Sequence, residues 1–243
     1  MLIPARYFLE VSLLTVAAQY KAHFSMWAVV NSPLLMGNDL RTLSPSALTI
    51  LNNPAVIAIN QDPLAKSAIR IFRNTNVAKD EYGMGECQIW SGKLFGGDQV
   101  VVFLNAADED LEMSATLKEI FIREAGKAPQ VEEEWHVHDL WANRMDEDTA
   151  RKILEAPVGS RTRLLAEANW YNATATPYDQ GIKHGDGRVL GKKVNTIEPH
   201  GVLKANVKRH SVEMFRLRSP NRATVKEYIA QDRMEEKAQH EEL

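Results

Sequence analysis

Two aspartates follow short apolar runs, at points where a barrel enzyme carries its chemistry. Asp39 comes soon after Leu34–Met36, and Asp62 comes soon after Val56–Ile59. Continuous apolar runs that end in polar residues are typical of buried parallel strands, and in a βα barrel the carboxyl ends of the strands face the active site. The two carboxyl groups are therefore candidate catalytic groups. The alternative is a structural role, in which they form hydrogen bonds within loops.

Two histidines, His136 and His138, stand two residues apart in a segment with strand character. Side chains at this spacing share one face of a strand, so the pair could begin a metal site. A zinc site needs three or four ligands, and no third ligand follows at a recognisable spacing. We therefore expect two exposed histidines and no metal. His23 stands among aromatic residues on a predicted helix, and we expect it to pack there rather than act as a base.

Three tryptophans are candidates for stacking against a sugar. Trp135 and Trp141 fall in or beside a predicted strand, and we expect both to pack in the core. Trp170, followed by Tyr171, lies in a loop-rich segment and is the better surface candidate. Cys87 is the only cysteine, and we expect it to be a buried thiol.

The bulk composition excludes several classes of function. The 243 residues carry a net charge of −3, so no electrostatic argument favours nucleic acid. No apolar run approaches the roughly 20 residues that span a bilayer. Residues 1–18 resemble a signal peptide, but Glu10 interrupts the apolar part and the positive charge comes late. Asn172-Ala173-Thr174 is a possible N-glycosylation site. We expect no cofactor and no membrane partner.

The elements that would position these residues change character after about residue 66. Before it, the sequence predicts a helix over 15–30 with Thr15 as its N-cap and one apolar face formed by Val16, Tyr20, Phe24 and Trp27. A strand over 34–38, a helix from Ser44-Pro45 to about residue 52 and a strand over 56–60 follow. This alternation is typical of βα units.

After residue 66 the sequence predicts short antiparallel strands, as in a β-sandwich. The strands are expected at 87–94, 99–105, 111–115, 131–140, 202–207 and 211–217, with Gly96-Gly97-Asp98 as a hairpin loop. Residues 155–196 are expected to be rich in loops. We therefore predict three regions: residues 1–66 as the end of a barrel, 67–219 as an antiparallel sandwich, and 220–243 as a charged tail.

Several long motifs in one collinear order resemble the α-galactosidases of glycoside hydrolase family 27. They are H-F-S-M-W (23–27), P-L-L-M-G-N-D-L-R (33–41), V-I-A-I-N-Q-D-P-L (56–64), Q-I-W-S-G-K-L (88–94), D-L-W (139–141) and R-H-S-V-E-M-F-R-L (209–217). N-W-Y-N-A-T (169–174) resembles the secreted fungal branch. The resemblance implies the last two βα units of a (β/α)₈ TIM barrel, followed by a C-terminal antiparallel β-sandwich.

The resemblance also implies an activity. Family members release terminal α-galactose from oligosaccharides or galactomannan by double displacement, with one aspartate as nucleophile and another as acid/base. Both family aspartates align upstream of Met1, and the galactose-binding D-P-D-M-L segment aligns with the unrelated residues 5–9. No catalytic or substrate-binding residue can therefore be assigned here, and we expect a fragment that does not hydrolyse α-galactosides alone.

Two other functions stay open. The chain could be a non-catalytic β-sandwich module that binds carbohydrate or a partner, or it could be a remnant without function. The resemblance implies an extracellular location for a full-length family member. We also expect residues 1–65 to be unstable alone, because two strands cannot close a barrel, and the sandwich to fold on its own core.

Overall fold

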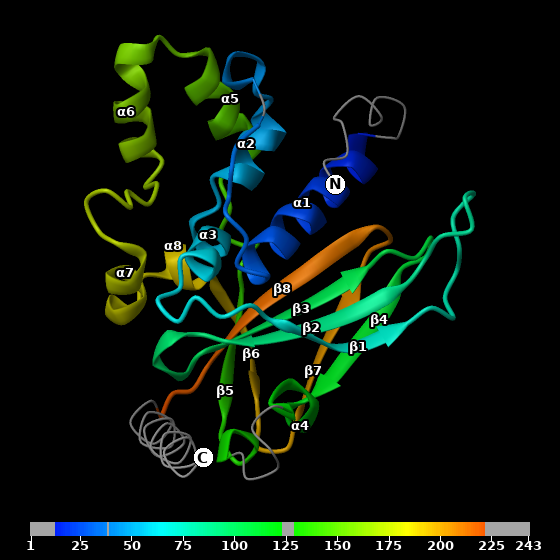
Figure 1. The fold of residues 1–243 in the computed structure, drawn as a ribbon. Coiled ribbons are helices and arrows are strands. Elements are labelled where there is room, and N and C mark those ends of the chain that lie inside the picture. The colour runs from blue at the N-terminus through cyan, green and yellow to red at the C-terminus, as the bar shows by residue number, and fades with distance from the viewer. Residues whose placement is uncertain (1–12, 38, 123–128, 222–243) are drawn as a thin grey trace, which may run out of the picture.

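A computed structural model describes residues 13–37, 39–122 and 129–221 of the chain (Figure 1). The α-helices are α1 (Leu13–Val29), α2 (Pro45–Leu51), α3 (Pro54–Asn60), α4 (Leu117–Ile120), α5 (Glu147–Glu155), α6 (Val158–Glu167), α7 (Tyr178–His184) and α8 (Gly187–Leu190). The strands are β1 (Ile69–Asn74), β2 (Cys87–Lys93), β3 (Gln99–Asn105), β4 (Leu111–Thr116), β5 (Trp135–Asp139), β6 (Lys192–Ile197), β7 (Val202–Val207) and β8 (Ser211–Arg218). Short 3₁₀ turns are η2 (Leu40–Thr42), η3 (Phe95–Gly97) and η5 (Pro129–Val131).

The strands form two antiparallel sheets. The larger sheet has six strands in the order β1-β2-β3-β8-β5-β6, and the smaller pairs β4 with β7. Hydrophobic residues of both sheets, among them Val101, Phe103, Trp135 and Leu217, form a core between them. The predicted antiparallel sandwich is therefore confirmed. The predicted hairpin loop at residues 96–98 is also confirmed, because β2 pairs with β3 on either side of η3.

The opposite face of the larger sheet is covered by helices α1, α2 and α3 (Figure 1). In the register of β3 with β8, Val102 faces Met214, and both belong to the apolar cluster that these helices close. The alternate residues Val101 and Phe215 belong to the core between the sheets. Burial on both faces explains why residues 100–104 are all apolar rather than alternating.

Helices α2 and α3 begin at side-chain caps followed by proline. The Ser44 hydroxyl accepts a hydrogen bond from the Ala47 N–H at 3.1 Å, and Pro45 is the first helical residue. The Asn53 carboxamide oxygen accepts from the Ala55 N–H at 3.0 Å, and Pro54 is the first residue of α3. Proline fits the first helical position because that position needs no N–H partner.

The two barrel strands predicted at residues 34–38 and 56–60 are wrong for this chain. Residues 56–60 form most of α3, because Asn53 and Pro54 start a helix there. Residues 34–37 have no regular structure, and the side chain of Leu35 is 90% exposed. A parallel strand needs a neighbouring strand to bind its N–H and C=O groups, and both sheets of the described residues are built without these segments.

Helix α1 agrees with the predicted range but starts earlier and buries another face. It begins at Leu13, so Thr15 lies inside the helix and is not its N-cap. Tyr20 and Trp27 are both 41% exposed, whereas Ala28 and Val29 are buried. Phe24 is the member of the predicted face that is buried. The burial of Val16 lies outside the described side chains.

Residues 155–196, predicted to be rich in loops, contain helices α6, α7 and α8 and most of strand β6. Helix α5, which ends at Glu155, was not predicted either. The predicted strand over 131–140 is shorter, limited to β5. Residues 1–12 and 222–243, which hold most of the possible signal and nearly all of the charged tail, lie outside the described residues. Within the described part, no helix has the length and apolar character needed to cross a membrane.

Candidate binding cleft beside helix α5

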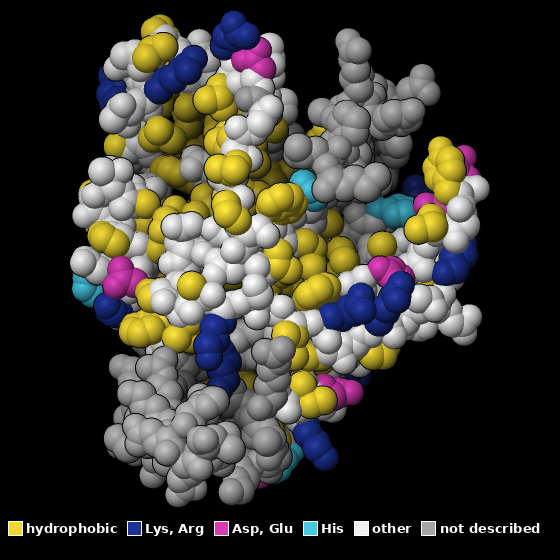
Figure 2. Space-filling view, viewed as in Figure 1, with side chains coloured by type: hydrophobic (Ala, Val, Ile, Leu, Met, Phe, Trp, Pro, Cys, Tyr) yellow, Lys and Arg dark blue, Asp and Glu magenta, His cyan; other side chains and the backbone are white. Residues whose placement is uncertain are grey.

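A cleft of about 720 Å³ opens between α5 and the segment that runs from Ala168 to Arg188. Its volume falls within the range of small-molecule sites. Apolar side chains of α2, α5 and α6 gather beside it, in the hollow at the upper left of Figure 2. The lining residues are Pro54, Asn143, Arg144, Met145, Asp146, Thr149, Ala168, Asn169, Trp170, Tyr171, Asp186, Gly187 and Arg188.

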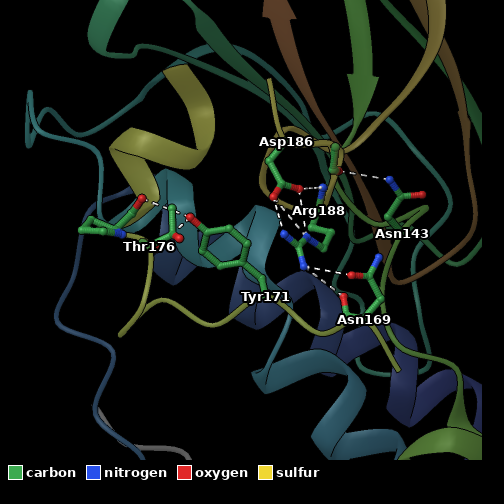
Figure 3. A network of polar contacts seen from close by, with 8 residues as sticks. Asn143, Asn169, Tyr171, Thr176, Asp186 and Arg188 are labelled. Atoms are coloured by element: carbon green, nitrogen blue, oxygen red, sulfur yellow. Dashed lines mark hydrogen bonds and ion pairs between the residues drawn. The ribbon is translucent and has the colours of Figure 1, made fainter. Parts of the chain in front are cut away.

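One wall of the cleft is an ion pair between Asp186 and Arg188 (Figure 3). The Arg188 Nη2 lies 2.6 Å from Asp186 Oδ2, and its Nε donates to both carboxylate oxygens. Asp186 also caps α8 by accepting the Arg188 backbone N–H at 2.9 Å. The other guanidinium nitrogen, Nη1, donates to the Asn169 carboxamide oxygen at 3.0 Å. These bonds fix the Arg188 side chain in one position.

Tyr171 packs between Arg188 of this wall and Tyr178 of α7. Its ring lies 5.3 Å from the Arg188 guanidinium and stacks on Tyr178 at 5.5 Å. Its hydroxyl donates to the carbonyl oxygens of Thr176 and Pro177, at 2.8 and 3.0 Å. A Cβ atom at Gly181 would clash with this hydroxyl, so α7 packs this closely against Tyr171 because residue 181 is glycine. Burial raises the pKa of Tyr171.

The opposite wall comes from the loop before α5. The Asn143 carboxamide donates to the Gly187 carbonyl oxygen at 3.1 Å, which joins the two walls at one end. Arg144 is exposed, and its side chain has no partner among the described residues. Asp146 caps α5 by accepting from the Thr149 N–H at 2.9 Å and its hydroxyl at 2.7 Å.

The two carboxyl groups of the cleft are unsuited to acid–base catalysis. The Arg188 side chain holds the pKa of Asp186 below its usual value, and hydrogen bonds from Thr149 lower the pKa of Asp146. A glycosidase needs one carboxyl group with a raised pKa that is protonated at the working pH. The cleft has the size of a ligand-binding site, but its carboxyl groups do not support hydrolysis.

Trp170 is the one predicted stacking residue that the structure places at this cleft. It is half-buried, lines the cleft, and packs against the apolar cluster that contains Met145 and Ile153. Trp135 and Trp141 are 0% and 4% exposed, so their predicted place in the core is confirmed. The Trp135 indole N–H donates to the Gln130 carbonyl oxygen and that of Trp141 to the Ser25 hydroxyl.

The two aspartates after the apolar runs are not brought together, and both have structural partners. Asp39 is exposed, and the Arg41 side chain donates hydrogen bonds to both of its carboxylate oxygens, at 2.8 to 3.2 Å. Asp62 is 7% exposed and accepts from the backbone N–H groups of Leu64 and Phe95. These contacts fit the structural role considered for both residues, and those of Asp62 connect the segment after α3 to the β2–β3 hairpin.

The histidines also have other partners. The His136 imidazole lies 3.3 Å from the Glu134 carboxylate, and the His138 imidazole lies 3.3 Å from the Gly191 carbonyl oxygen. Both are partly buried, so the prediction that they are exposed is wrong. Burial lowers the pKa of His138. Among the described residues, no group of His, Cys, Asp and Glu side chains could hold a metal ion.

Three further predictions concern single residues. Cys87 is 5% exposed and its pKa is raised by burial, so the predicted buried thiol is confirmed. His23 is exposed on α1 and accepts a hydrogen bond from the Trp27 indole N–H at 2.7 Å, so it has a partner but is not buried. Asn172 is exposed in a turn, where its carboxamide oxygen accepts from the Thr174 N–H at 3.0 Å.

Two segments of the chain match family models. Residues 11–62 match the model described as Alpha galactosidase A, and residues 84–161 match the Alpha galactosidase C-terminal beta sandwich domain. The α-galactosidase of Torulaspora delbrueckii is 46% identical over 202 residues, which is 83% of this chain and 41% of that protein.

The chain belongs to the α-galactosidase family.

Other relatives agree with this assignment. The α-galactosidase of Saccharomyces paradoxus is 43% identical over 82% of this chain and 41% of its own length. The structure of α-galactosidase from Saccharomyces cerevisiae with raffinose superposes with a TM-score of 0.78 at 39% identity, over 84% of this chain and 44% of that one. The α-galactosidase I of Mortierella vinacea, at 23% identity and a TM-score of 0.54, shares the fold.

The α-galactosidase family match confirms the predicted fold class, the end of a glycosidase barrel followed by an antiparallel sandwich, although residues 34–37 and 56–60 are not strands here. The chain spans about two-fifths of the length of these curated relatives. The two boundaries between its three predicted regions, after residues 66 and 219, stay predictions.

The cleft itself was mostly missed by sequence reasoning. Its walls come from residues about 40 positions apart, and of its lining residues the sequence singled out Trp170 and Tyr171. A signal was present in Asp186 and Arg188, because an aspartate two residues before an arginine at a helix start can both cap the helix and bind the arginine.

Proposed function

We propose that this chain is the barrel-end and sandwich portion of an enzyme that hydrolyses terminal α-galactosides. The observation that carries the proposal is 46% identity, over 83% of the chain, to a protein named α-galactosidase. The yeast relative of known structure was solved with raffinose, a neutral oligosaccharide. The proposed substrates are accordingly α-galactoside oligosaccharides or galactomannan.

The described residues offer no hydrolytic pair of their own. A retaining glycosidase needs two carboxyl groups about 5–5.5 Å apart with different pKa values. Asp39 pairs with Arg41 and Asp62 accepts from the Phe95 N–H, and the pKa values of Asp146 and Asp186 are both lowered. We propose that the two catalytic carboxyl groups belong to barrel strands outside these residues.

We also propose that the protein works outside the cell. The Asn172 side chain and the Thr174 of its sequon are both exposed, so an oligosaccharide could be attached without disturbing the core. Expression in a yeast secretory host would test this, because the Asn172→Gln variant should then migrate faster on a gel than the unaltered chain. Identical migration would contradict glycosylation at Asn172.

The test of the enzymatic proposal is a pair of assays. The coding transcript is first sequenced at its 5′ end in the source organism, and the protein that it encodes is assayed beside the 243-residue chain. We expect a longer protein that cleaves p-nitrophenyl α-D-galactopyranoside and not its β-anomer, and no cleavage by the 243-residue chain. A longer protein that leaves the α-galactoside intact would overturn the proposal.

A further inference from the structure

The charges that line the cleft cancel one another. Two arginines, Arg144 and Arg188, and two aspartates, Asp146 and Asp186, contribute to its walls. Arg188 is neutralised directly, because its guanidinium binds both oxygens of Asp186. The carboxylate of Asp146 is occupied by Thr149. A ligand that enters the cleft therefore meets many polar atoms but little net charge.

Several hydrogen-bonding groups at the cleft have no partner among the described residues. They are the guanidinium of Arg144, the indole N–H of Trp170 and the carboxamide N–H₂ of Asn169. The Asn143 carboxamide donates to Gly187 and keeps its oxygen as an acceptor. The Asn143 and Asn169 side chains are already held by these contacts, so they lose little freedom on binding, which favours a rigid ligand with many hydroxyls.

An apolar surface lies beside these polar groups. Trp170 lines the cleft and rests on the cluster formed by Met145, Ala150 and Ile153. A large aromatic ring next to fixed amide and guanidinium groups is the combination that recognises a sugar, whose ring has an apolar C–H face and a rim of hydroxyls. Tyr171 does not offer its ring for stacking, because Tyr178 and Arg188 already contact it.

We propose that this cleft binds a neutral saccharide and does not hydrolyse it. Trp170 contacts a sugar ring, and Asn143, Arg144 and Asn169 bind hydroxyl groups at its edge. An anion is the weaker alternative, because Arg188 is already paired and only Arg144 brings free positive charge. The choice of an α-galactoside as probe rests on the proposed function, but binding by the cleft does not depend on hydrolysis.

The experiment follows Trp170 directly in the 243-residue chain. The chain is labelled with 5-fluorotryptophan, and the ¹⁹F signal of Trp170 is assigned from its loss in Trp170→Phe. Raffinose, a galactomannan-derived oligosaccharide and inorganic phosphate are then titrated separately. We expect either saccharide to shift the Trp170 signal saturably, while the signals of the buried Trp135 and Trp141 stay in place and phosphate has no effect.

Matched variants test the residues without damaging the fold. Arg144→Ala removes an exposed side chain that has no described partner, and we expect it to weaken saccharide binding about fivefold to tenfold, equivalent to roughly 1–1.4 kcal/mol. Arg151→Ala is the control, because Arg151 is an exposed arginine of α5 that does not line the cleft and that pairs with Asp148 among the described residues. The control should bind as the unaltered chain does.

Three results would overturn the proposal: no saturable shift of the Trp170 signal with either saccharide, an equal shift with phosphate, or equal binding by Arg144→Ala and Arg151→Ala. Failure of this proposal is separable from failure of the proposed function. Binding is read here without turnover, whereas the enzymatic proposal is judged only by hydrolysis in the longer protein.

Discussion

Asp62 provides the sharpest test of how the helical segment is attached to the sheet. One oxygen of its carboxylate, Oδ1, accepts from the Leu64 N–H at 3.0 Å and from the Phe95 N–H at 2.9 Å. The other oxygen, Oδ2, accepts only from Phe95, at 3.0 Å. An asparagine with its oxygen at the Oδ1 position would therefore keep a partner for both donors, and an alanine would keep neither.

The two substitutions should differ by a measurable amount. Each N–H group that loses its acceptor costs about 1–3 kcal/mol when buried, and the lower end applies because both donors are only partly buried. We expect Asp62→Ala to lower the free energy of unfolding by about 2 kcal/mol, which corresponds to a fall in Tm of roughly 4–8 °C in a chain of this size. Asp62→Asn should cost less than about 1 kcal/mol.

The pH dependence gives a second check on Asp62. Burial raises the pKa of this carboxyl group above 3.8, so the folded state favours its neutral form. The stabilisation from that form is present below pH 3.8 and is lost as the pH rises through the raised pKa. Asparagine does not titrate, so the stability advantage of the unaltered chain over Asp62→Asn should become smaller as the pH rises through this range.

Urea unfolding followed by circular dichroism and tryptophan fluorescence measures these differences. Asp39→Ala is the matched control, since it removes an exposed aspartate whose partner is a neighbouring arginine, and it should leave stability unchanged. Equal destabilisation by Asp62→Asn and Asp62→Ala would refute the reasoning, because the negative charge rather than the acceptor geometry would then be the important property. An unaffected Asp62→Ala variant would refute it equally.

Three further outcomes can be checked with the same unfolding assay. Asp98→Asn should cost about 3–5 kcal/mol, because Arg216, 0% exposed and 2.9 Å from Asp98, would lose its carboxylate partner; a loss under about 1 kcal/mol would contradict this. Met214 lies under the helices and Leu217 lies on the other face of β8, so replacing either with alanine should lower the free energy of unfolding by about 2–5 kcal/mol. A near-neutral Met214→Ala variant would show that the helices do not cover the sheet. Burial raises the pKa of Glu213 above 4.5, so the folded state favours the neutral carboxyl group. The resulting stabilisation is present below pH 4.5 and is lost as the pH rises through the raised pKa. The Glu213→Gln variant should show a smaller fall in the free energy of unfolding over this pH range.

The sheet could be predicted from the sequence more fully than the helical segment. Residues 99–105 were predicted as a strand, and β3 has these bounds. The prediction succeeded because a short apolar run that follows a glycine turn is typical of a strand in a hairpin. The run at 56–59 has the same character but forms α3, since Asn53 and Pro54 supply a helix start just before it. Short apolar runs do not distinguish strand from helix, and the residues before them decide.

Other elements are formed by contacts distant in sequence. Strand β6 is mostly exposed and polar, and it is a strand because it pairs with β5 rather than because of its own pattern. The cleft also depends on contacts distant in sequence, because Asn143 binds Gly187 across the segment that contains α5 and α6. The N-cap of α5 was readable, because Asp146 precedes an acidic first turn and the apolar positions 150 and 153.

The structure also changes the expectation that the sandwich folds alone. A core between the two sheets exists, as expected. However, Val100, Val102 and Met214 face α1–α3 and would be exposed if that segment were removed. Two covered faces make the sheet and the preceding helices one packed unit, so a shortened chain that begins at residue 67 should aggregate more readily than the whole chain.

The central claim is that this chain supplies the barrel end and sandwich of an α-galactosidase. The most direct measurement replaces the aligned 202 residues of the Torulaspora delbrueckii enzyme with the matching part of this chain and assays the chimera on p-nitrophenyl α-D-galactopyranoside. We expect a folded chimera that hydrolyses this substrate, and no hydrolysis by the 243-residue chain alone. A folded chimera without activity, beside an active unaltered yeast enzyme, would contradict the claim.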